Sequence, residues 1–170
     1  FDSFYSAVLG AVNHIDEGTY AKLEADATAI QQIGQRTDFL VRVSGQKASR
    51  NLDSSEEFYL GGPNGVRAYA QGEGSGDEGV LSTAELRWHT PVRGLTFSTF
   101  YDAGTVRVNK SAIGGHNNVT LRGWGVGAAY SEPGDWFARL DYARRIGTDA
   151  SVAPQNNARG RVWFQLGKIW

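Results

Sequence analysis

Apolar and polar residues alternate with a period of two along most of this chain. In residues 21–29, Leu23 and Ala25 belong to an apolar face that is interleaved with Lys22 and Glu24. These residue types favour helices, but strict alternation over nine positions favours a half-buried β-strand. We therefore predict a strand here, with a helix as the less favoured alternative.

The same alternation recurs elsewhere, which gives eight predicted strands and an all-β, antiparallel fold class. The other seven segments cover residues 3–13, 39–46, 83–88, 95–102, 123–130, 136–143 and 161–166. No run of about 18 apolar residues occurs, so a transmembrane helix is excluded. The 22 glycines and the aromatic content of 12% fit a bacterial envelope protein, and they also fit an ordinary all-β domain.

Alternation by itself does not say which face of a strand is inside. A soluble β-sandwich buries the apolar face, whereas a membrane barrel turns it toward lipid. Predicted strands of about ten residues favour the membrane barrel. So do aromatic residues assigned to strand ends, as in an interfacial girdle: Trp88, Tyr101, Tyr130, Trp136 and Trp170.

The lengths of the connections also favour an outer-membrane barrel, in which short turns lie on one side and long loops on the other. The short connections are 31–37, 89–94 and 131–135, and the long ones are 48–79, 105–119 and 146–159. The exception is 14–18, which is short where a long loop is expected. The prediction is an antiparallel transmembrane β-barrel, with the soluble β-sandwich as the alternative.

Composition narrows the functional classes. The 170 residues fit one domain, and a formal net charge of −1 provides no basic field for nucleic acid. Cysteine is absent, which excludes disulfides and thiolate metal sites. The three histidines have no metal-ligand spacing, and no Ser–His–Asp set can be nominated. We expect no metal, no cofactor and no enzymatic activity. The chain has no signal peptide and opens in the middle of a pattern, so we expect a piece of a longer protein.

The longest connection contains "FYLGGPNGVRAY", residues 58–69. Its glycines and proline permit a tight reversal, and Arg67 follows between Val66 and Tyr69. If the loop folds back into the barrel interior, the two neighbours can pack there, and Arg67 then needs a carboxylate. Asp102 faces the interior by alternation and is the candidate partner. The alternative is a solvated arginine in a mobile loop.

Other polar segments are less specific. "GEGSG", residues 72–76, superficially resembles a phosphate loop, but no Lys-Ser/Thr pair follows it and no helix opens there. Asp77 and Glu78 could contact a cation, but we interpret them as part of a solvated loop. Arg139, Asp141 and Arg145 lie on the interior face of one predicted strand. They are candidates for lining a hydrophilic pore, and ordinary wall charges paired across strands are an equally weighted alternative.

Two motifs together resemble a known superfamily. The loop resembles the inward-folded loop of the outer-membrane protein assembly superfamily, whose usual core is V-R-G-F or V-R-G-Y. "FYDAGTV", residues 100–106, resembles its strand motif F-x-D-x-G. With "ELRW" and the ending "RVWFQLGKIW", the chain is most similar to TpsB transporters of two-partner secretion, the hemolysin or filamentous-hemagglutinin secretion/activation type. The matching loop residues are Gly61, Gly62, Val66, Arg67, Ala68 and Tyr69, and the strand residues are Phe100, Asp102 and Gly104.

The resemblance implies a Gram-negative outer-membrane pore that exports a large TpsA-type partner, an adhesin or hemolysin. It also implies that Arg67 pairs with Asp102 to hold the loop in the lumen. Ala68 stands where glycine is usual, and alanine would be strained if that position needs a positive φ. Two alternatives remain open: a self-standing eight-stranded barrel with a structural or adhesive role, and an assembly factor of the same superfamily.

The resemblance further implies a sixteen-stranded barrel with POTRA domains that this chain lacks. The motif loop joins strands eleven and twelve in that family, so residues 1–170 would be the C-terminal barrel half, strands nine to sixteen. Open strand edges do not stand in lipid. The remaining half, a second copy or self-closure would have to cover them, and self-closure would leave an interior filled with side chains.

The end of the chain resembles an outer-membrane assembly signal, which the barrel assembly machinery reads as a terminal aromatic preceded by alternating apolar residues. Phe164, Leu166 and Trp170 fit this pattern. Lys168 falls on the lipid-facing side, where its stem could extend to the interface. An incidental terminal tryptophan is the alternative.

Overall fold

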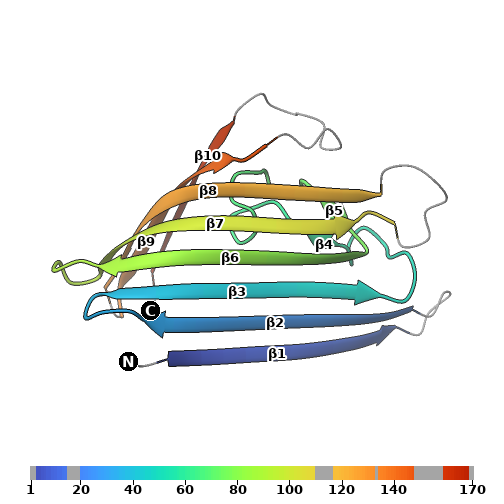
Figure 1. Ribbon diagram of the computed structural model, residues 1–170, viewed down its shortest axis with the longest axis horizontal. Helices are drawn as coiled ribbons and strands as arrows, with labels where there is room; N and C mark the ends of the chain where they lie inside the picture. The colour runs from blue at the N-terminus through green and yellow to red at the C-terminus, as the bar shows by residue number, and fades with distance from the viewer. Residues whose placement is uncertain (1–2, 15–19, 110–116, 133, 148–158, 169–170) are drawn as a thin grey trace.

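The computed structural model describes residues 3–14, 20–109, 117–132, 134–147 and 159–168. Within these ranges the chain forms ten β-strands (Figure 1). Eight of them make the main sheet: β1 (Ser3–His14), β2 (Tyr20–Gln32), β3 (Thr37–Ala48), β6 (Glu78–His89), β7 (Leu95–Arg107), β8 (Asn118–Ser131), β9 (Trp136–Arg145) and β10 (Gly160–Lys168). The other two, β4 (Phe58–Tyr59) and β5 (Ser75–Gly76), form a small separate sheet.

Every predicted strand is present, and each neighbouring pair is antiparallel. The segment with helix-forming residues is β2, so tertiary pairing with β1 and β3 overrides its helix propensity. Several strands are longer than predicted, because backbone pairing continues past the alternating stretch. β3, for example, extends beyond 39–46 at both ends. The β4–β5 pair was not predicted.

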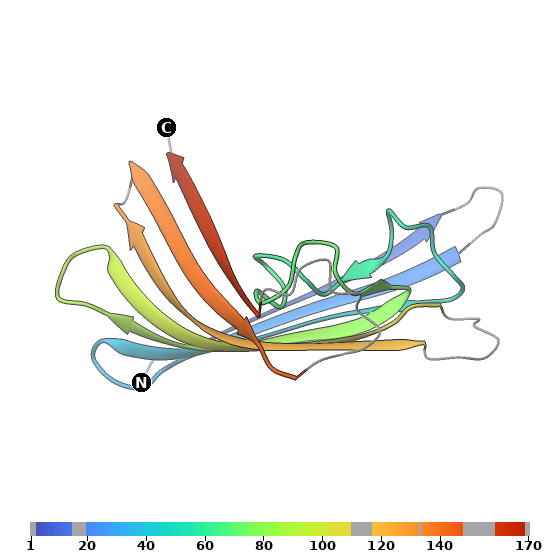
Figure 2. The ribbon, with the colours of Figure 1, turned by 90° about the horizontal axis from the view of Figure 1, so that it is seen from above.

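The eight strands follow one another in chain order, so β1 and β10 lie at opposite edges of the described sheet. Figure 2 shows the sheet curved into an open trough, with β9 and β10 rising on one side. Self-closure of the eight strands, one of the alternatives above, is therefore not what the described residues form. No helix long and apolar enough to cross a membrane is found among them.

The two faces of the sheet differ in an unusual way. The outward, convex face is apolar and open, with Leu140 50% and Phe164 64% exposed. Part of the concave face is covered by the segment 49–77, here called the inner loop, which carries β4 and β5 (Figure 2). The buried residues lie between this loop and β7–β9: Leu60, Val66, Ala68, Tyr69, Phe100, Val106, Val119, Leu121 and Ala143. A soluble sandwich would bury the apolar face of the sheet instead.

Short and long connections fall at opposite ends of the strands. The short ones are 33–36, 90–94 and 132–135, whereas the inner loop lies at the other end. Trp88, Tyr130 and Trp136 lie beside the short connections, as expected for one girdle. Tyr101 was wrongly assigned to a strand end. It lies in the middle of β7 opposite Trp124, because β7 extends six residues beyond it.

Candidate functional site

The inner loop turns back on itself within the concave face. From β4 its ladder continues as Leu60 N donates to Gly74 O at 2.8 Å and Gly61 N donates to Glu73 O at 2.9 Å. The tip then reverses at Gly62, whose φ of +133° suits glycine alone among common residues. The reversal ends where Val66 N donates to Leu60 O at 2.7 Å. This backbone arrangement delivers Arg67 to the sheet.

The structure brings Arg67 and Asp102 into direct contact. The Nε atom of Arg67 donates to Asp102 Oδ2, and Nη2 donates to Oδ1, both at 2.9 Å. The Arg67 backbone N also donates to Oδ2, at 3.1 Å. Arg67 is 3% exposed and Asp102 is 0% exposed. A planar guanidinium matched to both carboxylate oxygens is the strongest common type of side-chain ion pair.

Further groups complete the surroundings of the guanidinium. Its Nη1 donates to Glu85 Oε2 at 3.1 Å and lies 3.9 Å from Asp141 Oδ2. Its Cζ lies 3.2 Å from the centre of the Phe100 ring. Burial acts to lower the pKa of Arg67, but the hydrogen bonds and charge of Asp102, with Glu85 and Asp141, outweigh it and raise the pKa above its usual value. Because the pKa of Arg67 is higher in the folded protein than in the unfolded chain, its contribution to stability is fully present below the unfolded-state pKa of arginine. It is lost only as the pH rises through the raised, folded-state pKa.

Each residue of the strand motif has a separate role on the interior face of β7. Phe100 lies under the guanidinium, and Asp102 binds it. Gly104 makes room for the loop, because a Cβ atom there would lie 2.6 Å from Leu60 Cδ2. The hydroxyl of Thr83 on β6 donates to Asp102 Oδ1 at 3.0 Å and fixes the carboxylate.

Ala68 fits the loop without backbone strain. No non-glycine residue of the described ranges has a positive φ, so the concern raised by an alanine at this position does not apply. Ala68 is 1% exposed, and the wall residue that faces it is Gly123. A Cβ atom added to Gly123 would lie 2.7 Å from the Cβ of Ala68. The loop methyl group therefore occupies the space that the wall glycine leaves.

Two of the candidate pore residues contact the loop or its ion pair. Arg145 Nη2 binds Glu73 Oε2 at 2.9 Å, and its Nε donates to Ala68 O at 3.2 Å. Arg139 Nε donates to Asp141 Oδ2 at 2.7 Å. Asp141 is 3% exposed, so it faces the charge cluster around Arg67 rather than open space. Lining of a pore by these three residues stays a prediction.

Several contacts of the site were not anticipated from the sequence. Trp163 Nε1 on β10 donates to Arg67 O at 2.7 Å, so a third strand holds the loop. Asp77 and Glu78 lie in the segment interpreted as a solvated loop. Asp77 is instead 1% exposed and accepts a hydrogen bond from Leu52 N at 2.8 Å, and Glu78 is the first residue of β6 and lies 3.8 Å from Arg107. That interpretation was wrong for both residues. In the sequence these residues appear only as acidic residues in a glycine-rich loop. That pattern is also typical of exposed loops, so it does not predict buried carboxylates.

Two remaining expectations concern metals and the end of the chain. Across the described ranges, no group of three or more His, Cys, Asp or Glu side chains could hold a metal ion. Phe164 and Leu166 project from the convex face, 64% and 59% exposed. Trp170 lies outside the described residues, so the assembly signal as a whole stays a prediction.

Comparisons with known proteins agree with this geometry. The family model described as Haemolysin secretion/activation protein ShlB/FhaC/HecB matches residues 6–130. The heme/hemopexin transporter protein HuxB of Haemophilus influenzae is 31% identical over 139 residues, which are 78% of this chain and 24% of HuxB. Protein TOC75, chloroplastic, of Pisum sativum is 29% identical over 120 residues, 69% of this chain and 14% of that protein.

A solved structure gives the same fold. CdiB from Acinetobacter baumannii superposes with a TM-score of 0.72 at 18% sequence identity, over 97% of this chain and 31% of CdiB. The chain thus spans less than a third of the length of each of these relatives. Its family is one of outer-membrane transport proteins rather than enzymes. From the family match and the HuxB identity, the chain belongs to the ShlB/FhaC/HecB haemolysin secretion/activation family of two-partner secretion transporters, β-barrel proteins of the Gram-negative outer membrane.

Proposed function

We propose that the protein containing this chain is an outer-membrane pore that exports a large TpsA-type partner, an adhesin or hemolysin, in extended form. The observation that carries the proposal is the buried pair Arg67–Asp102 on the concave face of a sheet whose convex face is apolar. This combination supports a wall with hydrocarbon outside and a polar path inside, held partly filled by an anchored loop.

In this proposal the inner loop sets the shape of the path. Arg67, Arg145 and Trp163 attach it to β7, β9 and β10 respectively. An extended polypeptide would pass beside the docked loop, and the remaining polar side chains of the concave face, with Arg139 among them, would line its route. Loss of the attachment would let the loop leave its position and alter that route.

The proposal includes partners for the two sheet edges. In the part of the chain that the structure describes, β1 and β10 each pair with one neighbouring strand only, and open strand edges cannot remain within lipid. Further strands of the same protein, the other half of a sixteen-stranded barrel, would pair with them. Residues 1–170 are then one barrel portion, and its C-terminal residues Phe164, Leu166 and Trp170 would be read by the barrel assembly machinery.

Charge reversal at the anchor pair tests the proposal in the intact protein. Arg67→Glu or Asp102→Arg leaves a buried charge facing its own sign, which costs about 3–5 kcal/mol of loop docking. The ratio of docked to undocked loop should fall by roughly two to four orders of magnitude. We expect secretion of the cognate partner to fall sharply while the barrel still inserts, as measured by partner in the medium and by heat-modifiable mobility in outer-membrane fractions.

The matched control is Arg93→Glu, which reverses an exposed charge in a short connection and should leave secretion unchanged. Normal secretion in both anchor variants would refute the role of the pair. Deleting the gene for the whole protein distinguishes an export pore from an assembly factor. An export pore predicts that one secreted partner disappears from the medium, whereas an assembly factor predicts a general fall in the amount of outer-membrane β-barrel proteins. The ionic current through a planar bilayer distinguishes the export pore and the assembly factor from a small eight-stranded barrel. The interior of such a small barrel is filled with side chains and should carry almost no current.

A further inference from the structure

The convex face carries cations at the strand ends that lie beside the long connections. Lys47, Arg107, Arg122 and Arg144 are all exposed there and alternate with the interior-facing residues of β3, β7, β8 and β9. Among the described outward positions of the main sheet, Glu78 is the single carboxylate. The region is therefore net positive, although the sheet face beside it is apolar.

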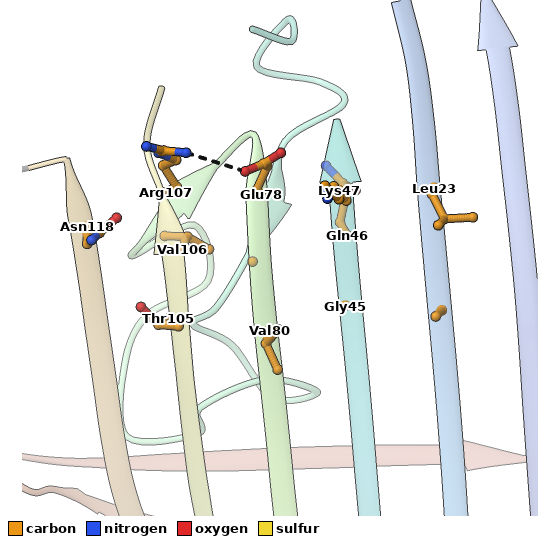
Figure 3. A pocket seen from close by; sticks show the side chains of 12 residues that line it. Leu23, Gly45, Gln46, Lys47, Glu78, Val80, Thr105, Val106, Arg107 and Asn118 are labelled. Atoms are coloured by element: carbon orange, nitrogen blue, oxygen red, sulfur yellow. Dashed lines mark ion pairs between the residues drawn. The ribbon is translucent and has the colours of Figure 1, made fainter. Parts of the chain in front are cut away.

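A groove lies directly below two of these cations. Its volume is about 490 Å³, and Figure 3 shows Lys47 and Arg107 at the strand ends with Gly45 and Val80 further down the strands. Gly45 pairs with Val80 across β3 and β6, and the missing side chain at Gly45 leaves a hollow beside Leu23. The groove thus combines a cationic rim with an apolar floor.

The charges at the rim do not cancel. Arg107 Nη1 lies 3.8 Å from Glu78 Oε2, a loose ion pair that Figure 3 marks with a dashed line. Lys47 forms no ion pair within the described residues, and the side chain of Arg107 remains 52% exposed. Lys47 on β3 and Arg107 on β7 flank Glu78 on β6, the strand between them, so the rim of the groove carries two cations and one carboxylate.

The orientation of the barrel places this groove at the outer leaflet. Short connections of outer-membrane barrels lie on the periplasmic side and long ones on the extracellular side. Lys47, Arg107 and Glu78 lie at the end of the sheet that carries the inner loop. The rim is therefore at headgroup depth, and the floor over Gly45 reaches the outer part of the hydrocarbon.

We propose that this groove is a binding site for a phosphorylated glycolipid of the outer leaflet, lipopolysaccharide. A phosphate sits between Lys47 and Arg107, where charge-assisted hydrogen bonds to both cations stabilise it. One acyl chain lies over Gly45 between Leu23 and Val80, where it covers apolar surface. The inference rests on the outer-membrane location and is independent of the proposed export.

Lipid retention by the intact protein tests this site. The protein is placed in nanodiscs that contain either lipid A, phosphatidylglycerol or phosphatidylethanolamine alone, and the lipid kept after transfer to mild detergent is counted by native mass spectrometry. Wild type should keep lipid A in preference to both others. Lys47→Gln and Arg107→Gln should each lower the retained lipid A about fivefold, and the double variant about 25-fold.

Two further variants make the test specific. Gly45→Val keeps both cations but fills the groove floor. A Cβ atom at Gly45 meets nothing nearer than Gly79 O at 3.5 Å, so this variant should fold and still lose lipid A. Lys168→Gln removes an outward cation at the opposite end of the sheet and should change nothing. Equal retention of phosphatidylglycerol and lipid A by wild type would overturn the proposal, as would undiminished lipid A in the double variant or in Gly45→Val.

Discussion

Glycines in the wall decide how closely the inner loop approaches the sheet. At Gly104 a Cβ atom would lie 2.6 Å from Leu60 Cδ2, and at Gly123 it would lie 2.7 Å from the Cβ of Ala68. Both distances are shorter than contacts in close-packed interiors allow. The two glycines therefore allow the loop to pack closely against the sheet. This packing adds to the attachment that the Arg67–Asp102 ion pair provides.

The contact between Ala68 and Gly123 gives a compensating pair of substitutions. Gly123→Ala should destabilise loop docking by about 1–3 kcal/mol, because two methyl groups compete for one space. Adding Ala68→Gly to the same chain should restore most of the loss, since it removes one of the methyl groups. The measurement is the urea midpoint of the intact protein in detergent, compared across the four members of the cycle.

The control for this cycle is Gly45→Ala on the convex face, where the nearest atom to an added Cβ is 3.5 Å away. It should leave the midpoint close to that of wild type. Additive effects of Gly123→Ala and Ala68→Gly, with no recovery in the double variant, would contradict the proposed packing.

Sequence reasoning at this scale succeeded where two independent patterns agreed. Asp102 was found because alternation placed it on the interior face and a strand motif also singled it out. Glu85 and Glu73 were not found as partners of Arg67 and Arg145. The period of two assigns a face to Glu85, but it says nothing about how a folded loop is positioned above that face.

The inner loop behaves as an element in its own right. Its small β4–β5 sheet and its turn hydrogen bonds give it internal structure, and its apolar residues form one side of the buried core. Three strands hold it through the side chains of Asp102, Arg145 and Trp163. Such a loop should dock and undock as a unit, not residue by residue.

Single cysteines can report this docking, because the 170 residues contain none. Val66 is 0% exposed and Tyr59 is 45% exposed. With a membrane-impermeant maleimide added to whole cells or purified protein, Tyr59→Cys should label quickly and Val66→Cys hardly at all. Adding Arg67→Glu to Val66→Cys should raise its labelling toward the rate at Tyr59→Cys, since the loop is then released.

The same Val66→Cys chain with Arg93→Glu should stay protected, because Arg93 lies in an exposed short connection. Rapid labelling of Val66→Cys in the otherwise unchanged protein would show that the loop is not docked. Protection that persists with Arg67→Glu would show that apolar packing alone holds the loop in place.

At the scale of the whole molecule, the distribution of polarity is reversed relative to a soluble protein. Ionised side chains such as Arg67 and Asp102 are buried on the concave face, while Trp124, Val126 and Leu140 are exposed on the convex one. Alternation in the sequence predicted the two faces but not which was outside, because both arrangements have the same period. Strand lengths, aromatic positions and connection lengths favoured the membrane arrangement, and the docking of the inner loop on the polar face agrees with it.

The tryptophans allow this reversal to be measured directly. Trp124 projects from the convex face and is 43% exposed, whereas Trp163 points inward and donates to Arg67 O. Two versions of the intact protein, each with one of these tryptophans and phenylalanine at the other tryptophan positions, are reconstituted in lipid with brominated acyl chains. Bromine quenches only fluorophores that it contacts, so the fluorescence of Trp124 should fall strongly while that of Trp163 stays nearly unchanged. Acrylamide dissolved in the water should quench Trp163 more than Trp124. The quenching of Trp163 should still be incomplete, because the docked loop contacts this side chain. Quenching of Trp163 by brominated lipid, with Trp124 unaffected, would place hydrocarbon on the concave side and would remove the physical basis for an internal, loop-filled path.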